Sequence, residues 1–174
     1  MVDLEFVCFF AKTAHGEQKR KYTNDPYIVH PVSVANIVAS VCFDPDVIAA
    51  ALLHDVVEDT PVTLSELRAV FGVRIASFVS EVTDVSRPQD GNRAVRKKLD
   101  REHLAKASPQ AQTIKLADLI DNTKSIVAHD PDFAKVYLQE KRALLEVLTM
   151  GHHILYDRAV DLVGTAEIAL GLSV

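Results

Sequence analysis

The chain has 174 residues, of which 48% are hydrophobic and 25% charged, and its formal net charge is −5. This length suits one globular domain over residues 1–174, and the acidic balance argues against a general binder of nucleic acid or anionic membranes. Two cysteines, no basic leader and no apolar run of the ~20 residues that span a bilayer argue against a disulfide framework and predict a cytoplasmic protein.

Hydrophobic residues recur at helical spacing along the whole chain, and no segment alternates as a strand does. This pattern predicts an all-α protein, an orthogonal helical bundle. The expected helices cover residues 3–15, 31–41, 45–60, 63–72, 73–84, 93–106, 109–128, 131–149 and 152–170. Their starts carry local signals, such as the Thr63–Glu66 capping box and the N-cap and proline pair Ser108-Pro109.

Between the first two helices, a polar segment carries the basic run Lys19-Arg20-Lys21, which is typical of a solvated loop. His30 follows, directly before Pro31, and a proline disfavours helical backbone at the residue that precedes it. We therefore expect His30 at the entrance of a helix. A lone histidine is more often structural than a ligand, so its role depends on the side chains near it.

The segment that ends the helix from residue 45 concentrates polar groups: His54, Asp55, Glu58 and Asp59. Each carboxylate at the negative end of a helix costs roughly 0.3–1 kcal/mol, and Asp55 and Asp59 repel as an i,i+4 pair by roughly 0.2–0.5 kcal/mol. Several locally unfavourable charges in one segment indicate a functional site. A divalent cation would be bound by these carboxylates and would remove their repulsion. The alternative is an exposed acidic helix end.

The helix over residues 93–106 is strongly basic for an acidic protein. Its cations are Arg93, Arg96, Lys97, Lys98 and Arg101. They either pair with neighbouring acids on a solvated face or form a wall that faces an anion, and the sequence leaves both interpretations open.

The next helix carries a polar stripe of Asp118, Asn122 and Ser125 at i, i+4 and i+7, with apolar residues around it. A buried carboxylate needs a partner, so Asp118 is expected to form a salt bridge or to bind a cation. His152 and His153 are adjacent and point about 100° apart on a helix, which favours a structural or surface role for both.

His30, the pair His54-Asp55 and Asp118 follow the order H…HD…D, and in this pattern the chain resembles the HD phosphohydrolase superfamily. The segments 20–31, 51–60, 81–84 and 107–122 are similar in order and spacing to the RelA/SpoT-type hydrolase domains. The resemblance covers roughly residues 5–130. It implies the HD-domain fold and hydrolysis of the 3′-diphosphate of the alarmone nucleotides ppGpp and pppGpp, with Mn²⁺.

The resemblance also implies roles for single residues. The metal ligands would be His30, His54, Asp55 and Asp118. Glu58 and Asp59 match the pair that positions and activates the attacking water. Arg20 matches the residue that stacks on guanine, and Lys21 is its basic neighbour, while Asn122 and Ser125 match positions near the nucleoside, where the family often has threonine in place of Ser125. The basic helix adds Arg96 and Lys97 as candidate substrate contacts.

The chemistry of these residues agrees with the resemblance. Two imidazoles and two carboxylates leave water positions open on a six-coordinate ion, which suits one Mn²⁺ per chain, with Fe²⁺ or Zn²⁺ as alternatives. Such an ion lowers the pKa of a bound water and neutralises phosphoryl charge. Glu58, one turn after His54, is then placed to accept the proton.

The chain carries no synthetase domain after the hydrolase motifs, so it resembles the small, hydrolase-only members of the family. Two alternatives are an HD phosphohydrolase that acts on 5′-nucleotides and a module that binds an alarmone without cutting it. The expected partner is a small-molecule nucleotide, and neither nucleic acid nor membrane is expected. The sequence distinguishes neither guanine from adenine nor one oligomeric state from another.

Overall fold

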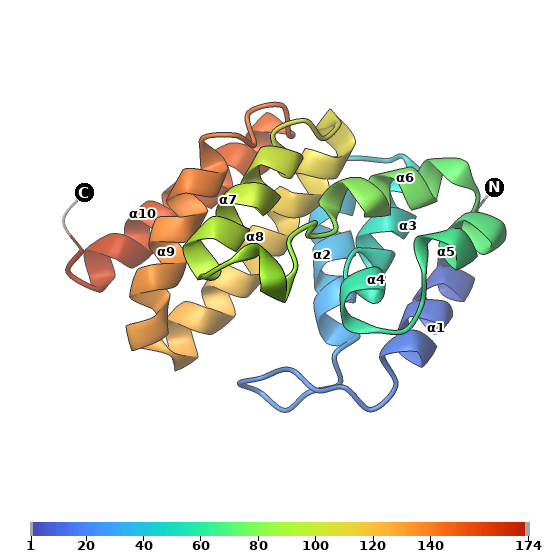
Figure 1. Cartoon of the computed structure of the whole chain (residues 1–174), viewed down its shortest axis with the longest axis horizontal. Coiled ribbons are helices and arrows are strands. Elements are labelled where there is room, and N and C mark those ends of the chain that lie inside the picture. The colour runs from blue at the N-terminus through green and yellow to red at the C-terminus, as the bar shows by residue number, and fades with distance from the viewer. Residues whose placement is uncertain (1, 173–174) are drawn as a thin grey trace. The chain divides into compact units, whose positions relative to one another are not determined.

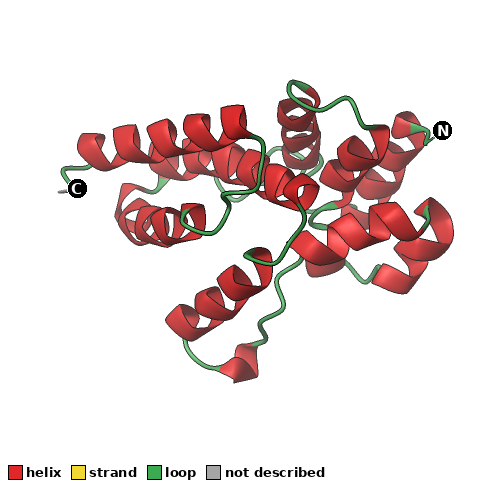
Figure 2. Ribbon diagram, turned by 90° about the horizontal axis from the view of Figure 1, so that it is seen from above, coloured by secondary structure: helices red, strands yellow, loops and turns green. Residues whose placement is uncertain are grey.

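The computed structural model describes residues 2–172, and their regular structure is helical, without a strand (Figure 2). The all-α prediction is confirmed. The chain divides into two compact units, Met1–Thr83 and Asp84–Val174. The expectation of a single domain stays a prediction. Within residues 2–172, every helix is too short or too polar to cross a bilayer.

The first unit contains the helices of the N-terminal half of the chain (Figure 1). They are α1 (Leu4–His15), α2 (Val29–Ala39), α3 (Pro45–Leu53), α4 (Val56–Asp59), α5 (Leu64–Phe71) and α6 (Val73–Val82). Asp3 caps α1 by accepting from the backbone of Glu5 and Phe6 at 3.0 and 3.2 Å. Thr63 and Glu66 form the predicted capping box at α5.

Helix α3 is the centre of the first unit. It packs against α1, α2 and α6, and residues 49–53 are at most 6% exposed. An apolar helix surrounded in this way loses water from all its faces, and each fully buried Leu or Val side chain contributes about 1.5–3 kcal/mol. The residues that follow α3 are therefore attached to the most rigidly packed helix of the unit.

The second unit contains the short 3₁₀ turn η1 (Pro88–Asp90) and the helices α7 (Arg93–Leu104), α8 (Pro109–His129), α9 (Pro131–Leu145) and α10 (His153–Ala169). Helix α8 packs against α9 and α10 and carries more buried residues than any other helix of this unit. An ion pair between exposed Arg142 and buried Glu167 links α9 to α10.

The connection from α9 to α10 crosses α8 at close range. A Cβ at Gly151 would lie 2.5 Å from Leu116 Cδ1 and 3.2 Å from the Gln112 backbone, so this position needs glycine. Buried Gln112 accepts from the Met150 backbone at 2.9 Å. The expected break between the last two helices is present, although α9 ends at Leu145 and not at residue 149.

Candidate active site

The segment from His54 to Asp59 does not continue α3. Helix α3 ends at Leu53, His54 and Asp55 form a turn, and α4 covers Val56–Asp59. The prediction of one helix through residue 60 is wrong at this turn. The break moves the carboxylates away from the negative end of α3, since Asp55 now precedes α4 and Glu58 and Asp59 lie in its first turn.

His30 lies in the first turn of α2, which begins at Val29. The expected place of His30 at the entrance of a helix is confirmed, although the helix begins at Val29 rather than at Pro31. The first turn of a helix leaves its backbone N–H groups without intrahelical partners, so a proline there costs no hydrogen bond. His30 N donates to Tyr27 O at 2.9 Å, and the His30 residue is 2% exposed.

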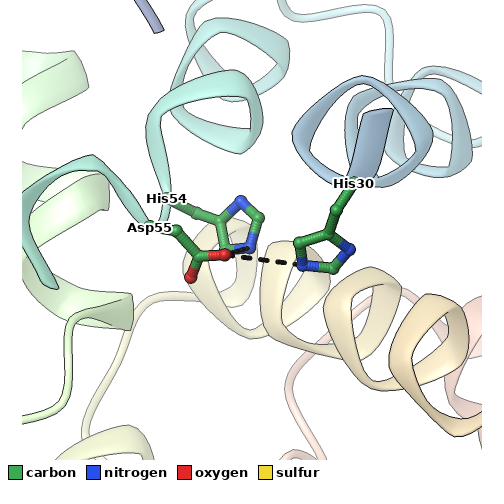
Figure 3. A group of neighbouring side chains, drawn as sticks. All are labelled: His30, His54 and Asp55. Carbon is green, nitrogen blue, oxygen red and sulfur yellow. Dashed lines mark ion pairs between the residues drawn. The ribbon is translucent and has the colours of Figure 1, made fainter. Parts of the chain in front are cut away.

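The structure brings His30, His54 and Asp55 together (Figure 3). Asp55 Oδ2 lies 3.1 Å from His54 Nε2 and 3.5 Å from His30 Nε2, and the two imidazole centroids are 5.1 Å apart. His54 Nδ1 lies 2.8 Å from Ala51 O, which can only accept, so Nδ1 carries the hydrogen and Nε2 presents its lone pair to the cluster. Two imidazole nitrogens and a carboxylate oxygen suit a divalent transition metal.

Tyr27 supports this cluster, although no role was predicted for this residue. Its hydroxyl donates to Asp55 Oδ2 at 2.6 Å, and its ring lies 5.9 Å from the His30 ring and 4.6 Å from the His15 ring, centroid to centroid. The bond fixes the oxygen that faces both imidazoles. The one sequence signal was its position, three residues before His30.

Glu58 and Asp59 lie on the exposed side of α4. Asp59 Oδ2 accepts from Gln18 Nε2 at 3.1 Å, and Gln18 Oε1 lies 2.8 Å from Nδ1 of the buried His15. Because the Asp59 carboxylate needs a donor, the amide nitrogen of Gln18 faces it, and His15 Nδ1 then donates to the amide oxygen. Gln18 and His15 thus orient Asp59 from the core. The catalytic roles of Glu58 and Asp59 stay predictions.

Arg20 and Lys21 lie between α1 and α2, in the segment expected to be a loop. Arg20 lies over the Tyr27 ring, 5.9 Å from its centroid, so it stands beside the residue that holds Asp55. Lys21 Nζ lies 4.6 Å from the Tyr22 ring centroid and donates to its hydroxyl at 2.9 Å. A substrate role for Arg20 and Lys21 stays a prediction.

Asp118 belongs to the second unit and is 6% exposed, as its apolar surroundings predicted. Its Oδ2 lies 3.1 Å from Lys115 Nζ, and its Oδ1 accepts from Asn122 Nδ2 at 2.6 Å. The salt bridge expected for a buried carboxylate is therefore present. Ser125 lies one turn further, partly buried, on the same helix. The metal role of Asp118 and the substrate roles of Asn122 and Ser125 stay predictions.

The basic helix α7 is partly paired with acids. Arg93 donates to Glu140 at 2.6 and 2.9 Å, and this bond raises the pKa of Arg93. Lys97 Nζ donates to Asp84 Oδ2 at 2.8 Å. Burial would raise the pKa of Asp84, but the nearby ammonium groups, Lys115 first and Lys97 second, lower it overall.

Arg96 is half-buried, and its Nε, which is shielded from solvent, has no hydrogen-bond partner within residues 2–172. Lys97 and Arg101 line a small cavity in the second unit. Arg93 and Lys97 therefore pair with acids, as the first interpretation of α7 predicts, and Lys97 also lines the cavity. The second interpretation, a wall that faces an anion, stays a prediction. The substrate roles proposed for Arg96 and Lys97 stay predictions.

A larger, open hollow of about 430 Å³ lies along α5 and α6 in the first unit. None of the predicted site residues lines it. The volume of a hollow is therefore a poor guide to the candidate site in this protein.

Comparison with known proteins adds to this geometry. A profile described as the HD domain matches residues 8–147. The guanosine-3′,5′-bis(diphosphate) 3′-pyrophosphohydrolase MESH1 of Danio rerio is 39% identical over 131 residues, which are 74% of this chain and 71% of that protein. The human protein of the same name is 38% identical over 71% of this chain and 69% of its own length.

A longer relative of the same enzyme name, from Aquifex aeolicus, is 37% identical over 81% of this chain, which spans only 19% of that protein. Among solved structures, a metazoan ortholog of SpoT, described as hydrolysing ppGpp and playing a role in starvation responses, is similar with a TM-score of 0.83 and 29% identity. That likeness covers 98% of this chain and 96% of the other. A protein of Listeria monocytogenes is similar with a TM-score of 0.69 and 25% identity, over 87% of this chain and 99% of that one.

Proposed function

The chain belongs to the HD-domain family, and we propose that it hydrolyses ppGpp and pppGpp at the 3′ position, releasing pyrophosphate with GDP or GTP. One observation carries the proposal. The chain matches small enzymes with this name over more than two thirds of their length as well as its own, at 38–39% identity. The clustered His30, His54 and Asp55 supply chemistry that such a reaction needs.

HD-domain hydrolases are metal-dependent, and His30, His54 and Asp55 form a possible metal site. We propose that Asp118 is the fourth ligand and that one Mn²⁺ is bound per chain, with Fe²⁺ or Zn²⁺ as alternatives. When bound, a divalent ion lowers the pKa of a coordinated water and offsets phosphoryl charge. The fit rests on the donor set, since nitrogen and oxygen ligands of this kind suit Mn²⁺.

Four residues of the chain have different proposed roles in the reaction. Glu58 accepts the proton of the attacking water as a general base. Asp59 orients that water, and Gln18, which donates to Asp59 at 3.1 Å, keeps the carboxylate in one position. Tyr27 does the same for Asp55 through its 2.6 Å bond. Pre-oriented groups of this kind lower the entropy that the reaction has to lose.

Substrate contacts are proposed at both ends of the nucleotide. Arg20, supported by the Tyr27 ring, stacks on the base, with Lys21 beside it. Asn122 and Ser125 approach the nucleoside, and Arg96 and Lys97 of the basic helix face the phosphates.

We further propose that the protein works in the cytoplasm on small nucleotides rather than on nucleic acid or membranes.

The test is a product analysis with the purified chain and Mn²⁺. The nucleotides are ppGpp, pppGpp, GDP and GTP, and both pyrophosphate and orthophosphate are measured. We expect pyrophosphate from the first two and nothing from GDP or GTP, which have no 3′-diphosphate. Orthophosphate from GDP with ppGpp untouched would instead identify a 5′-nucleotidase. Tight binding of ppGpp without turnover would identify a sensing module.

A further inference from the structure

A cavity of about 50 Å³ lies in the second unit, lined from α7, α8 and α9. Its volume is several times the roughly 10–15 Å³ that one water needs, which leaves room for a phosphoryl group. The polar residues that line it are Asp84, Lys97, Arg101, Lys115, Glu140 and Lys141. Cations outnumber acids by four to two.

Both acids of the cavity are already engaged. Asp84 accepts from Lys97 at 2.8 Å, and Glu140 takes both of its bonds from Arg93. A carboxylate that already binds one cation neutralises less of the charge of a second cation. The positive charge in this cavity therefore exceeds what its own acids neutralise.

Lys141 is, with Arg101, one of two cations of the cavity for which the described residues provide no ion pair. Within residues 2–172, no carboxylate lies at ion-pairing distance from Lys141 Nζ, which lies over the Tyr137 ring, 4.9 Å from its centroid. Burial, followed by repulsion from Lys115, lowers the pKa of Lys141 to about 8. The charged and titratable groups around it are Asp84, Lys97, Arg101, Lys115, Asp118, Tyr137 and Glu140.

We propose that this cavity is an anion site for one phosphoryl group of a diphosphate and that Lys141 Nζ binds that group directly. The inference rests on the proposed function and deepens it, because the diphosphate is the group that the reaction removes. Lys115 links the cavity to the proposed metal ligand Asp118. It lines the cavity, and its Nζ lies 3.1 Å from Asp118 Oδ2. A compact ammonium suits phosphate as a point charge, and a shielded cation gains most from such a partner.

The direct test is calorimetric titration of the chain with inorganic pyrophosphate at pH 7 in the presence of EDTA, so that no metal contributes. We expect Lys141→Met to weaken binding about tenfold or more, as for a lost hydrogen bond between charged groups. Lys135→Met is the matched control, because Lys135 is exposed on the same helix and pairs with Asp132. Equal affinity of the wild type and Lys141→Met would overturn the proposal.

A second measurement needs no variant. An amine with a pKa of about 8 reacts faster at pH 8 than ordinary lysines do, so limited acylation followed by peptide mass spectrometry reports on Lys141. We expect pyrophosphate to protect Lys141 while the labelling of Lys135 is unchanged. Labelling of Lys141 that pyrophosphate does not slow would contradict the assignment.

Two further comparisons are needed. One distinguishes a 5′-diphosphate from pyrophosphate as the bound group, and the other distinguishes loss of the anion site from loss of the reaction. GDP carries only a 5′-diphosphate, and we expect its affinity to change less than that of pyrophosphate when Lys141 is replaced. A larger effect on GDP would overturn the link to the departing group. Because the titration needs no turnover, Lys141-dependent binding by a chain that fails to hydrolyse ppGpp would retain the anion site and reject the reaction.

Discussion

Two buried or half-buried carboxylates, one in each unit, are stabilised in opposite ways. Asp55 in the first unit receives a hydrogen bond from the Tyr27 hydroxyl and faces the Nε2 atoms of His30 and His54. Asp118 in the second unit contacts the Lys115 ammonium and the Asn122 amide. The first carboxylate is held by groups that orient it, and the second by one that also neutralises it.

The cluster around Asp55 would gain from an added cation, whereas the cavity beside Lys115, the partner of Asp118, would gain from an added anion. Around Asp55, imidazole lone pairs and a carboxylate oxygen all lie within 4.8 Å of one another, an arrangement that a divalent cation would stabilise. Around Lys115 and Lys141, ammonium groups exceed the acids that line the same cavity. A metal-dependent reaction on a diphosphate needs both kinds of site.

The largest expected effect comes from Glu58→Gln. The amide keeps the size of the side chain but cannot accept a proton, and loss of a general base typically costs ~10²–10⁴-fold in rate. Steady-state hydrolysis of ppGpp measures this loss. Metal analysis should still find about one ion per chain, because Glu58 is not a proposed ligand. Glu146→Gln, at an exposed position, is the control, and full turnover by Glu58→Gln would show that the base is another group.

Metal binding should stabilise the first-unit cluster. A ligand at a hundredfold excess over its Kd adds about 2.7 kcal/mol to the free energy of unfolding. Thermal melts with EDTA and with added Mn²⁺ should therefore differ for the wild type. His54→Ala should remove most of the difference, since it deletes a proposed ligand. Equal melting temperatures in EDTA and Mn²⁺, with no metal in the purified chain, would contradict a metal site.

A smaller effect is expected from Gln18→Leu, which removes the bond to Asp59 and leaves α4 in place. A hydrogen bond to a charged group contributes roughly 1.5–3 kcal/mol, so kcat should fall about tenfold or more. KM should change little, because Gln18 is not a proposed substrate contact. Gln139→Leu, at an exposed position of α9, should leave kcat unchanged. A rise in KM alone would mean that Gln18 acts on binding instead.

The smallest effect concerns stability against pH in the second unit. The pKa of Lys141 falls to about 8 in the folded chain, below the ordinary value of 10.5, so between these pH values the unfolded chain binds more protons. The contribution of Lys141 to the free energy of unfolding therefore rises with pH over this window. Urea titrations of the wild type and Lys141→Met at pH 8 and pH 10 measure it. An equal pH response in both proteins would contradict the shift.

The parts of the fold that were predictable from sequence are those with local signals. Asp3, Thr63 and Ser108 cap helices where their side chains can reach backbone N–H groups, and this chemistry needs no tertiary context. The turn at His54-Asp55 was missed because no glycine or proline marks it. The helix was expected to begin at Pro31 rather than at Val29, because the steric effect of a proline on the residue before it disfavours helical backbone without excluding it.

The candidate site also contains residues that could be predicted from the sequence and residues that could not. His30, His54 and Asp55 were identified from their order and are brought together in the first unit. The bond from Gln18 to Asp59 joins residues 41 apart in the sequence, which no local pattern reveals. The proposed role of Lys141 could not be predicted for a related reason. A single lysine on a predicted helix is expected to be exposed to solvent, and only the structure shows that it lines a cavity.

The central claim is that the chain removes the 3′-diphosphate as one unit. Phosphorus NMR of ppGpp during turnover with Mn²⁺ tests it most directly, because the 3′ and 5′ diphosphates give separate signals. We predict that the 3′ signals disappear, that pyrophosphate appears in equal amount and that the 5′ signals become those of GDP. Orthophosphate as the first product, or loss of the 5′ signals while the 3′ signals remain, would contradict the account.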